Sequence, residues 1–510
     1  MIIVGVQWPE IKKDTVKFLW HTNKTIPLFK KNNFYFRYEG LNIEKMPIEV
    51  YWNTFLALMV PMFNLCKEDV LFIFPHSIPS FMAETWIDFH NASNISIFPL
   101  SDKPSKELAT INNNSTTVNS KVGILFGGGK DSSCTFSILS ELYGIEDILL
   151  ISYVFGHDES AINKINQRRE NMILKPLKKD SNVNIQKIIS DFQSTLTNQS
   201  HIYIPHTALF TGSVLPVIIK YNISLLTHSN EFISYTTGHY NSKVTQFNFK
   251  RSRPEYDSYL SQRINSFFRT DLSIKNFSYF ISDLVAFKLL AHRYPHILKH
   301  IMMCETTENP KAKWCKNCHK CAVYVYYSLY TGHEQHDIDI DYFFSESSYI
   351  KNILKSTKNL KPTENGNYPW HPCIGYLESF SHIIASINPE EVRKRTSPKG
   401  YRNFLIIKSR YGNKKFPIYE SFIQPAFKKL SLPFSKKIRK IITTQCAEIK
   451  EMPEYFNIRN GKATIDYNLN CHIPKIFIKN HEKNTYLHSV SNKLLQGIEE
   501  LTNNKNNNKL

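Results

Sequence analysis

Short, continuous apolar runs alternate with amphipathic stretches through the middle of the chain. Buried strands are predicted at residues 122–126, 147–155, 201–205 and 223–230. Helices are predicted at residues 134–142, from about 158 to 177, and at 276–300. Strands that are apolar along their whole length, rather than at alternate positions, are typical of parallel sheets covered by helices. The pattern therefore predicts an α/β fold built on a parallel sheet.

The pattern changes on both sides of this region. Upstream, two short apolar strands, at 70–75 and 95–100, accompany one predicted helix, and a polar stretch follows. Downstream, the periodicity weakens and basic residues accumulate before a tail rich in Asn and Lys. The predicted order is a smaller N-terminal α/β region (1–100), a linker (101–120), a central domain (121–335), a basic C-terminal region (336–490) and a disordered tail (491–510).

Length and charge refine this picture. A chain of 510 residues exceeds one ordinary core, so two or three domains are expected. The net charge is +19, and residues 391–450 alone hold 16 Lys/Arg against 3 Asp/Glu. Such a segment is typical of a surface for nucleic acid, anionic membrane or a phosphorylated substrate, or of a solvated lysine-rich face. The solvated face is favoured over a nucleic-acid surface, because no aromatic-interleaved motif accompanies the charge.

Two further patterns bear on location. The longest apolar runs, such as residues 55–66, are shorter than the roughly 18–20 residues that a bilayer requires, so no membrane span is expected. The N-terminus lacks a basic segment followed by a long apolar one, so no secretory signal is evident. A cytoplasmic location is the resulting expectation.

The first chemical motif is FGGGKDSS, which follows the apolar run at 122–126. Glycines let a backbone approach phosphate, and the amides at a helix N-terminus point at the anion. A Walker loop needs Ser or Thr after its lysine, but Lys130 is followed by Asp131. A dinucleotide-binding fingerprint needs a sixth-position glycine, where this chain has Ser132. The motif predicts a phosphate loop of another kind.

The second motif is a cysteine cluster, Cys315-x-x-Cys318-x-x-Cys321, with Cys304 upstream. Four thiolates suit tetrahedral Zn²⁺, and a site of this type is closed and structural rather than catalytic. Cys304 is the most distant ligand in sequence, and His319 is an alternative to it. Reduced, buried cysteines without a metal are the competing interpretation.

The glycine motif resembles the loop of the ATP pyrophosphatases (PP-loop family), whose pattern is Ser-Gly-Gly-x-Asp-Ser. Gly127 replaces the leading serine, whereas Gly128, Gly129, Asp131 and Ser132 match. The resemblance implies an adenine nucleotide alpha hydrolase-like domain that transfers AMP from ATP to a substrate oxygen and releases pyrophosphate. A PP-loop followed by a cysteine knuckle is similar to 7-cyano-7-deazaguanine synthase.

A more specific resemblance is to the UDP-N-acetylmuramoyl-L-alanyl-L-glutamate epimerase family. It rests on the segments THSNE, WCKNCHKC and HPCIGYLES. That family adenylates the α-carboxylate of a terminal L-glutamate, which makes the Cα proton removable, and reprotonation inverts the centre. The implied ligands are ATP, Mg²⁺, Zn²⁺ and a small-molecule or peptide substrate that carries a carboxylate. The alternatives are a ligase or base-modifying enzyme of the deazaguanine synthase type, or another carboxylate-activating enzyme of specialised or defence metabolism.

Applied to the residues of this chain, the resemblance implies that the glycine loop binds the phosphates and that Asp131 binds magnesium. The implied nucleotide-binding residues are Gly127, Gly128, Gly129, Lys130, Asp131, Ser132, Ser133 and Asn230. Glu231, at the end of a predicted strand, is placed near the nucleotide or substrate. Cys373 is a candidate acid or base, with His371 and Glu378 as comparable candidates and a buried apolar role as the alternative.

The chain also departs from the epimerase pattern. FISYTTGHYNS stands where an arginine-containing run is expected, and Glu305-Thr306 follows Cys304 where Asn-Arg is expected. Arg251 or Arg253 are candidates for the missing cation. These departures bear on the substrate more than on the activation chemistry.

Overall fold

The structure is a computed structural model. It describes residues 1–66, 68–102, 122–197, 206–229, 254–268, 270–304, 309–334, 337–356, 377–412, 415 and 417–450, and the short strands β14 (Ile458–Arg459) and β15 (Lys462–Ala463). For residues 356, 377 and 378 and for β14 and β15, the description is limited to the backbone. The predicted strand at 201–205 and most of the predicted linker lie outside the described residues.

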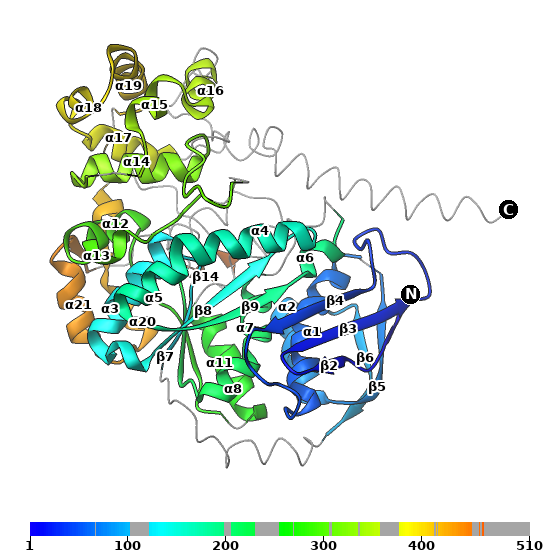
Figure 1. Ribbon diagram of the computed structural model, residues 1–510. Coiled ribbons are helices and arrows are strands. Elements are labelled where there is room, and N and C mark those ends of the chain that lie inside the picture. Colours follow the sequence, from blue (N-terminus) through cyan, green and yellow to red (C-terminus); the bar gives the residue numbers. More distant parts are fainter. Residues whose placement is uncertain are drawn as a thin grey trace.

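A large mixed sheet forms the centre of the molecule (Figure 1). Its strands are β1 (Ile2–Val6), β2 (Glu10–Lys12), β3 (Thr15–Thr22), β4 (Asn33–Tyr38), β5 (Val70–Pro79), β6 (Ile95–Ser101), β7 (Val122–Leu125), β8 (Ile148–Phe155), β9 (Asn184–Ser190), β10 (Leu225–His228) and β11 (Ser273–Asn276). The order is β11-β10-β7-β8-β9-β4-β3-β1-β5-β6, and β2 pairs with β3. From β11 to β9 all neighbouring strands are parallel, which confirms the predicted α/β class.

The N-terminal strands continue this sheet rather than forming a sheet of their own. Strand β4 pairs antiparallel with β9, so residues 36–38 lie beside residues 188–190. Two helices, α1 (Ile48–Asn64) and α2 (Ser80–His90), accompany these strands, so the prediction of one helix in residues 1–100 is wrong. Helix α2 starts directly after β5 with no polar interval, which is why its start is hidden in the sequence pattern.

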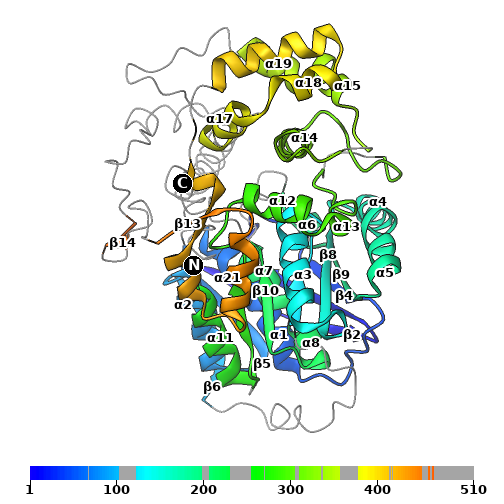
Figure 2. The ribbon, with the colours of Figure 1, turned by 90° about the vertical axis from the view of Figure 1, so that its left-hand side faces the viewer.

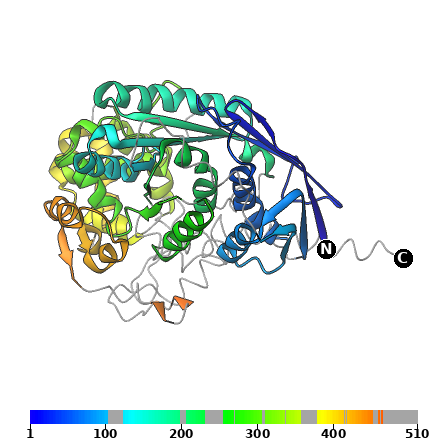
Figure 3. The same cartoon turned by 90° about the horizontal axis from the view of Figure 1, so that it is seen from below.

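Helices cover both faces of the sheet (Figure 3). Helices α3 (Lys130–Tyr143), α5 (Lys175–Ser181), α12 (Asp283–His292), α13 (Pro295–Leu298) and α14 (His319–Thr331) contribute to one buried cluster. Helices α1, α2, α7 (His206–Ser213), α8 (Leu215–Tyr221) and α11 (Pro254–Phe268) contribute to the other. Strand β8 serves both, because Ile148 and Leu150 belong to the first cluster and Leu149 and Ile151 to the second. This two-sided burial explains its uninterrupted apolar sequence.

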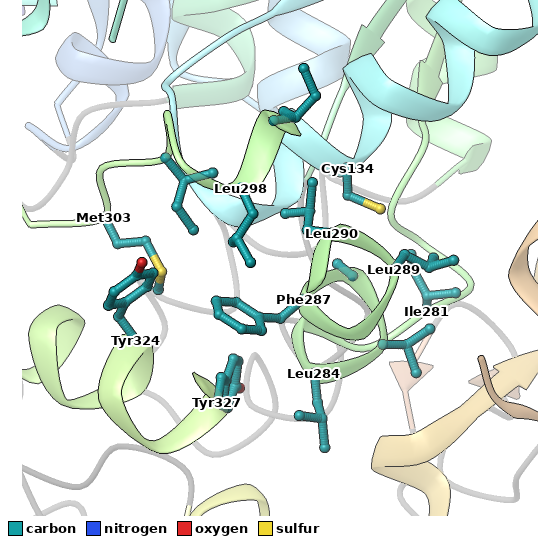
Figure 4. Close-up of a cluster of buried hydrophobic side chains, with 14 of the residues drawn as sticks. Cys134, Ile281, Leu284, Phe287, Leu289, Leu290, Leu298, Met303, Tyr324 and Tyr327 are labelled. Atoms are coloured by element: carbon teal, nitrogen blue, oxygen red, sulfur yellow. The ribbon is translucent and has the colours of Figure 1, made fainter. Parts of the chain in front are cut away.

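The basic C-terminal segment packs onto the first of these clusters. It consists of α15 (Ile340–Ser345), α16 (Ser348–Ser356), α17 (Leu377–Ser386), α18 (Pro389–Arg395), α19 (Pro398–Tyr411), β12 (Ser421–Ile423), α20 (Gln424–Leu430), α21 (Ser435–Thr443) and β13 (Ala447–Ile449). The amide of Ile423 donates to the carbonyl of Phe280, 3.0 Å away. In the same cluster, Phe287 of α12 packs edge-on against Tyr324 and Tyr327 of α14 (Figure 4).

The remaining helices are short. They are α4 (Glu159–Arg169), a π-helical turn (Glu170–Leu174), α6 (Phe192–Thr195) and two 3₁₀ turns (Ile145–Asp147 and Pro417–Glu420). Among the described residues, no helix is both long enough and apolar enough to cross a bilayer.

Glu420 contacts α17 within the C-terminal segment and connects that segment to α12, and its charge makes these contacts sensitive to pH. Its carboxylate lies 2.8 Å from Nε2 of His382 and 3.4 Å from Nζ of Lys288. The hydrogen bond from His382 lowers the pKa of Glu420 to about 2, helped by Tyr330 and Lys288 and opposed by burial. A depressed carboxyl pKa stabilises the fold at neutral pH, and this stability is lost as the pH falls from about 4.5 towards 2.

We therefore expect Glu420→Gln to destabilise the protein by about 1–2 kcal/mol at pH 7, after allowance for its partial exposure. The difference from wild type should shrink below pH 4 in thermal melts, because the carboxyl of the unfolded chain then takes up a proton that the folded state, with its pKa of about 2, does not yet bind. Glu390→Gln, on the exposed α18, is the matched control and should leave the melting temperature unchanged at both pH values. An equal loss at pH 3 and pH 7 would contradict this assignment.

Candidate functional site

The glycine motif lies where a parallel strand ends and a helix begins. Strand β7 ends at Leu125, and α3 starts at Lys130 with Gly129 as its N-cap and no capping side chain. A Cβ atom added to Gly127 or Gly129 would meet no atom within 4 Å, so the backbone is open on this side. Gly128 has φ +76°, and a Cβ there would lie 2.4 Å from Cδ1 of Ile173. The turn requires glycine at position 128, and no side chain caps the first amides of α3.

Two carboxylates and a lysine meet at the start of α3. Nζ of Lys130 lies 2.8 Å from Oδ2 of Asp131 and 3.6 Å from Oδ2 of Asp283, the first residue of α12. The hydroxyl of Tyr327 donates to the same oxygen of Asp283, 2.5 Å away. Lys130 is buried, with 4% of its side chain exposed. Its ammonium group therefore balances two carboxylates inside the protein instead of pointing into solvent.

Each of these carboxylates also holds an unsatisfied oxygen. Oδ1 of Asp131 and Oδ1 of Asp283 are buried and have no hydrogen-bond partner among the described residues. A buried acceptor without a partner costs roughly 1–3 kcal/mol. Mg²⁺ prefers carboxylate oxygens and is commonly held by one or two carboxylates together with substrate phosphates. A buried, unpartnered carboxylate oxygen is therefore an atom to which a divalent cation could bind.

The serines of the motif are held by the loop and by α3 itself. The hydroxyl of Ser132 donates to the carbonyl of Gly129, 3.3 Å away. Ser133 is buried, and its carbonyl accepts from the hydroxyl of Ser137 one turn later. The amide of Ser132 belongs to the first turn of α3, where a phosphate contact is through the backbone, whereas the amide of Ser133 donates to the carbonyl of Gly129 at 3.0 Å.

The four cysteines form a cluster that could hold a metal ion, as predicted. Their Sγ atoms all lie within 4.8 Å of one another. Sγ of Cys318 is 3.8 Å from that of Cys304 and 3.6 Å from that of Cys321, and Cys315 is 3.7 Å from Cys321. Tetrahedral zinc with Zn–S bonds of about 2.3 Å places its sulfurs about 3.8 Å apart. The cluster includes Cys304 and does not include His319.

Backbone amides surround the sulfurs. The amides of Cys315, Asn317 and Cys321 each donate to a cysteine Sγ at 3.4 Å. Amide donors stabilise thiolates, which are the form that binds metal. The chain turns through Lys316 with φ +64°, and α14 then begins with Cys318 as its N-cap.

Hydrogen bonds connect the cysteine cluster to the glycine loop. The amide of Met302, two residues before Cys304, donates to the carbonyl of Gly128 at 2.8 Å. Arg168 of α4 is buried and donates to the carbonyl of Cys304 at 2.8 Å, as well as to those of Ala312 and Lys313 at 2.9 Å. Helix α14 begins at the cluster and carries Tyr327, which contacts Asp283. The cysteine cluster is therefore connected to the glycine loop in two ways, through the Met302–Gly128 hydrogen bond and through α14.

Several predicted residues cannot be placed. Asn230, Glu231, Arg251, Arg253, His371 and Cys373 lie outside the described residues, and for Glu378 the description is limited to the backbone. Their roles stay predictions. The neighbouring Ser229 is described, and its hydroxyl lies 2.9 Å from that of Thr135 in α3. The THSNE segment therefore starts beside the glycine loop.

Two groups at this edge were missed by sequence reasoning. One is Asp283, whose sequence signal is that of an ordinary acidic residue in a first helical turn. The other is His228, whose Nε2 lies 2.9 Å from Oδ1 of the fully buried Asp257. Asp257 also accepts from the amide of Asn276 at 2.8 Å. His228 lies within the THSNE segment, but its partner on α11 is distant in sequence and carries no recognisable signal.

The chain was compared with protein-family models, with curated proteins and with solved structures, and nothing matches it in any of the three.

Proposed function

We propose that this chain is an ATP-dependent enzyme that activates a carboxylate by transferring AMP to it. The observation that carries the proposal is the pair of buried, unpartnered carboxylate oxygens of Asp131 and Asp283 beside an uncapped helix N-terminus. This pair lies at the carboxyl edge of a parallel sheet, where ligands of open α/β sheets bind. A cation site next to a phosphate site suits a nucleoside triphosphate with its magnesium ion.

In the proposed reaction, a carboxylate oxygen of the substrate attacks the α-phosphorus of ATP. The bond between the α-phosphorus and the bridging oxygen breaks, and pyrophosphate leaves with the electron pair. The amides of Gly129 to Ser132 would hold the phosphates, and Asp131 and Asp283 would hold Mg²⁺. The metal ion, when bound, neutralises charge that develops on the leaving pyrophosphate. Lys130 supplies a fixed positive charge between the two carboxylates.

The most specific form of the proposal is epimerisation of the terminal L-glutamate of UDP-N-acetylmuramoyl-L-alanyl-L-glutamate. It rests on the resemblance of the quoted segments. Adenylation removes the negative charge of the α-carboxylate, and the Cα proton becomes acidic enough for a base to remove. A proton is then returned to the opposite face of Cα, and water cleaves the acyl-adenylate into the D-glutamate peptide and AMP. The His228–Asp257 pair is the described group beside the loop with the chemistry to move such a proton. The alternative is a ligase of the 7-cyano-7-deazaguanine synthase type, in which ammonia attacks the acyl-adenylate.

ATP–pyrophosphate exchange across a panel of carboxylates tests the activation step. We expect exchange that depends on both magnesium and one class of carboxylate, because the adenylation step is reversible. Turnover in D₂O then separates the two forms: epimerisation incorporates deuterium at Cα, whereas the ligase forms AMP in an ammonia-dependent way without such incorporation. If ATP is instead cleaved to ADP, or if no carboxylate supports exchange, the proposal is wrong.

A further inference from the structure

A second candidate site lies at the opposite end of α3 from the glycine loop. A cavity of about 300 Å³ is lined by residues of α3, of the C-terminal end of α12 and of α21. Figures 1 and 2 both show α21 beside α3. Since α3 has 14 residues, about 20 Å separates its two ends. We call this site the α21 cleft and define it by Glu141, Arg293, Lys437, Lys440, Thr444 and the adjoining Phe434.

The α21 cleft carries positive charge that the fold does not balance. Residues 428–450 hold seven Lys/Arg and one Glu. Arg293 is neutralised by Glu141, which it contacts at 3.0 and 2.6 Å, and Arg439 is neutralised by Glu448 at 2.6 Å. Within the described residues, Lys437 and Lys440 form no ion pair. Both line the cavity, so it favours an anion.

An exposed aromatic ring lies beside these lysines. Phe434 is 42% exposed and is held edge-on against Tyr143, with ring centroids 5.1 Å apart. Nζ of Lys437 lies 5.6 Å from the centre of the same ring. Phe434 also has φ +55°, a left-handed conformation that is strained for a bulky residue. Strain of this kind is concentrated at ligand clamps and similar sites.

We propose that the α21 cleft binds single-stranded nucleic acid, with one backbone phosphate at Lys437, a second at Lys440 and an unpaired base stacked on Phe434. A basic groove beside an exposed ring is the combination that sequence-tolerant single-strand binding uses. A membrane surface is disfavoured, because Ile438, Ile441 and Ile442, the apolar face of α21, are buried in the protein. That face is therefore not available to enter a bilayer.

Fluorescence anisotropy of short labelled oligo(dT), measured from roughly 50 to 200 mM salt, tests the proposal. We expect binding that weakens with salt. Lys437→Glu/Lys440→Glu should weaken it at least about tenfold and should lower the salt slope by about 1.4, the value for two lost phosphate contacts on a single strand. Phe434→Ala should weaken binding about fivefold or more with the salt slope unchanged.

The matched control is Lys12→Glu/Lys45→Glu, which makes the same charge change on exposed lysines of the N-terminal region and should bind like wild type. Melting temperatures equal to that of wild type establish that each variant is folded. Lys437→Gln/Lys440→Gln should have an affinity for the oligonucleotide between those of wild type and the double glutamate variant. Three outcomes would overturn the proposal. They are an equal loss in the control variant, equal affinity for duplex DNA of the same length, and tighter binding to phosphatidylserine vesicles than to the oligonucleotide.

Discussion

Replacement of Cys318 by serine is expected to remove the bound metal and to lower the melting temperature by on the order of 10 °C. Structural zinc contributes its binding free energy to folding, and a closed site with four thiolates loses most of it when one ligand is removed. Cys318 is also the N-cap of α14, and its Sγ lies within 4 Å of two other cysteine sulfurs. Metal analysis of the purified protein, together with thermal melts, measures both effects.

Cys446→Ser is the control for this prediction. Cys446 is half-buried and lies outside the cluster, and its sulfur contacts the carbonyl of Ile442 at 3.3 Å. We expect this variant to retain one metal ion per chain and to melt close to wild type. If the wild-type protein contains no metal and both serine variants melt alike, the cluster is a group of reduced cysteines and not a metal site.

Metal removal should also loosen the contacts that hold the glycine loop. The amide of Met302 holds the carbonyl of Gly128, and α14 carries Tyr327 to Asp283. The cysteine cluster anchors both of these segments. Both contacts would loosen together, so a variant that lacks the metal should bind ATP more weakly even where the chain remains folded. The structural site and the proposed nucleotide site are thus parts of one assembly.

The features that could be predicted from the sequence are those set by local spacing. Strands β7 and β8 are apolar throughout because helices cover both of their faces, and the cysteine cluster follows from residues that are close in sequence. Strand β9 was missed because it mixes apolar with polar residues. One of these, Lys187, is placed in the sheet by ion pairs to Glu39 and Glu170 at 2.5 and 3.1 Å.

Features that depend on distant segments could not be predicted. Asp283 reaches the glycine loop only because α12 packs beside α3, and Asp257 reaches His228 only because α11 covers β10 and β11. The pairing of β4 with β9 also could not be predicted, because nothing in the sequence of either strand indicates its partner. Local patterns therefore located the loop and the cysteines, whereas the second carboxylate and the histidine–aspartate pair required the fold.

Asp131→Asn is expected to reduce ATP–pyrophosphate exchange by roughly 10³-fold or more, and Asp283→Asn by roughly 10- to 100-fold. The amide keeps the size of the side chain but lacks the charge that would hold a cation beside the phosphates. Asp131 lies in the glycine loop itself, so its replacement should affect the binding of both the proposed cation and the proposed nucleotide. Asp283 would hold the cation from α12, so its loss should appear first as a higher magnesium requirement.

Asp180→Asn is the matched control for both variants. This exposed carboxylate of α5 contacts Lys299 and His300, at 2.5 and 3.0 Å, and its replacement should leave the exchange rate unchanged. Magnesium should raise the melting temperature of the nucleotide-bound wild type, and this increase should be lost in Asp131→Asn. Because the carboxylates of Asp131 and Asp283 both lie beside Lys130, the double variant should lose little more than Asp131→Asn alone. An additive double variant, or an Asp131→Asn protein with exchange near the wild-type rate, would show that the two carboxylates do not share a cation.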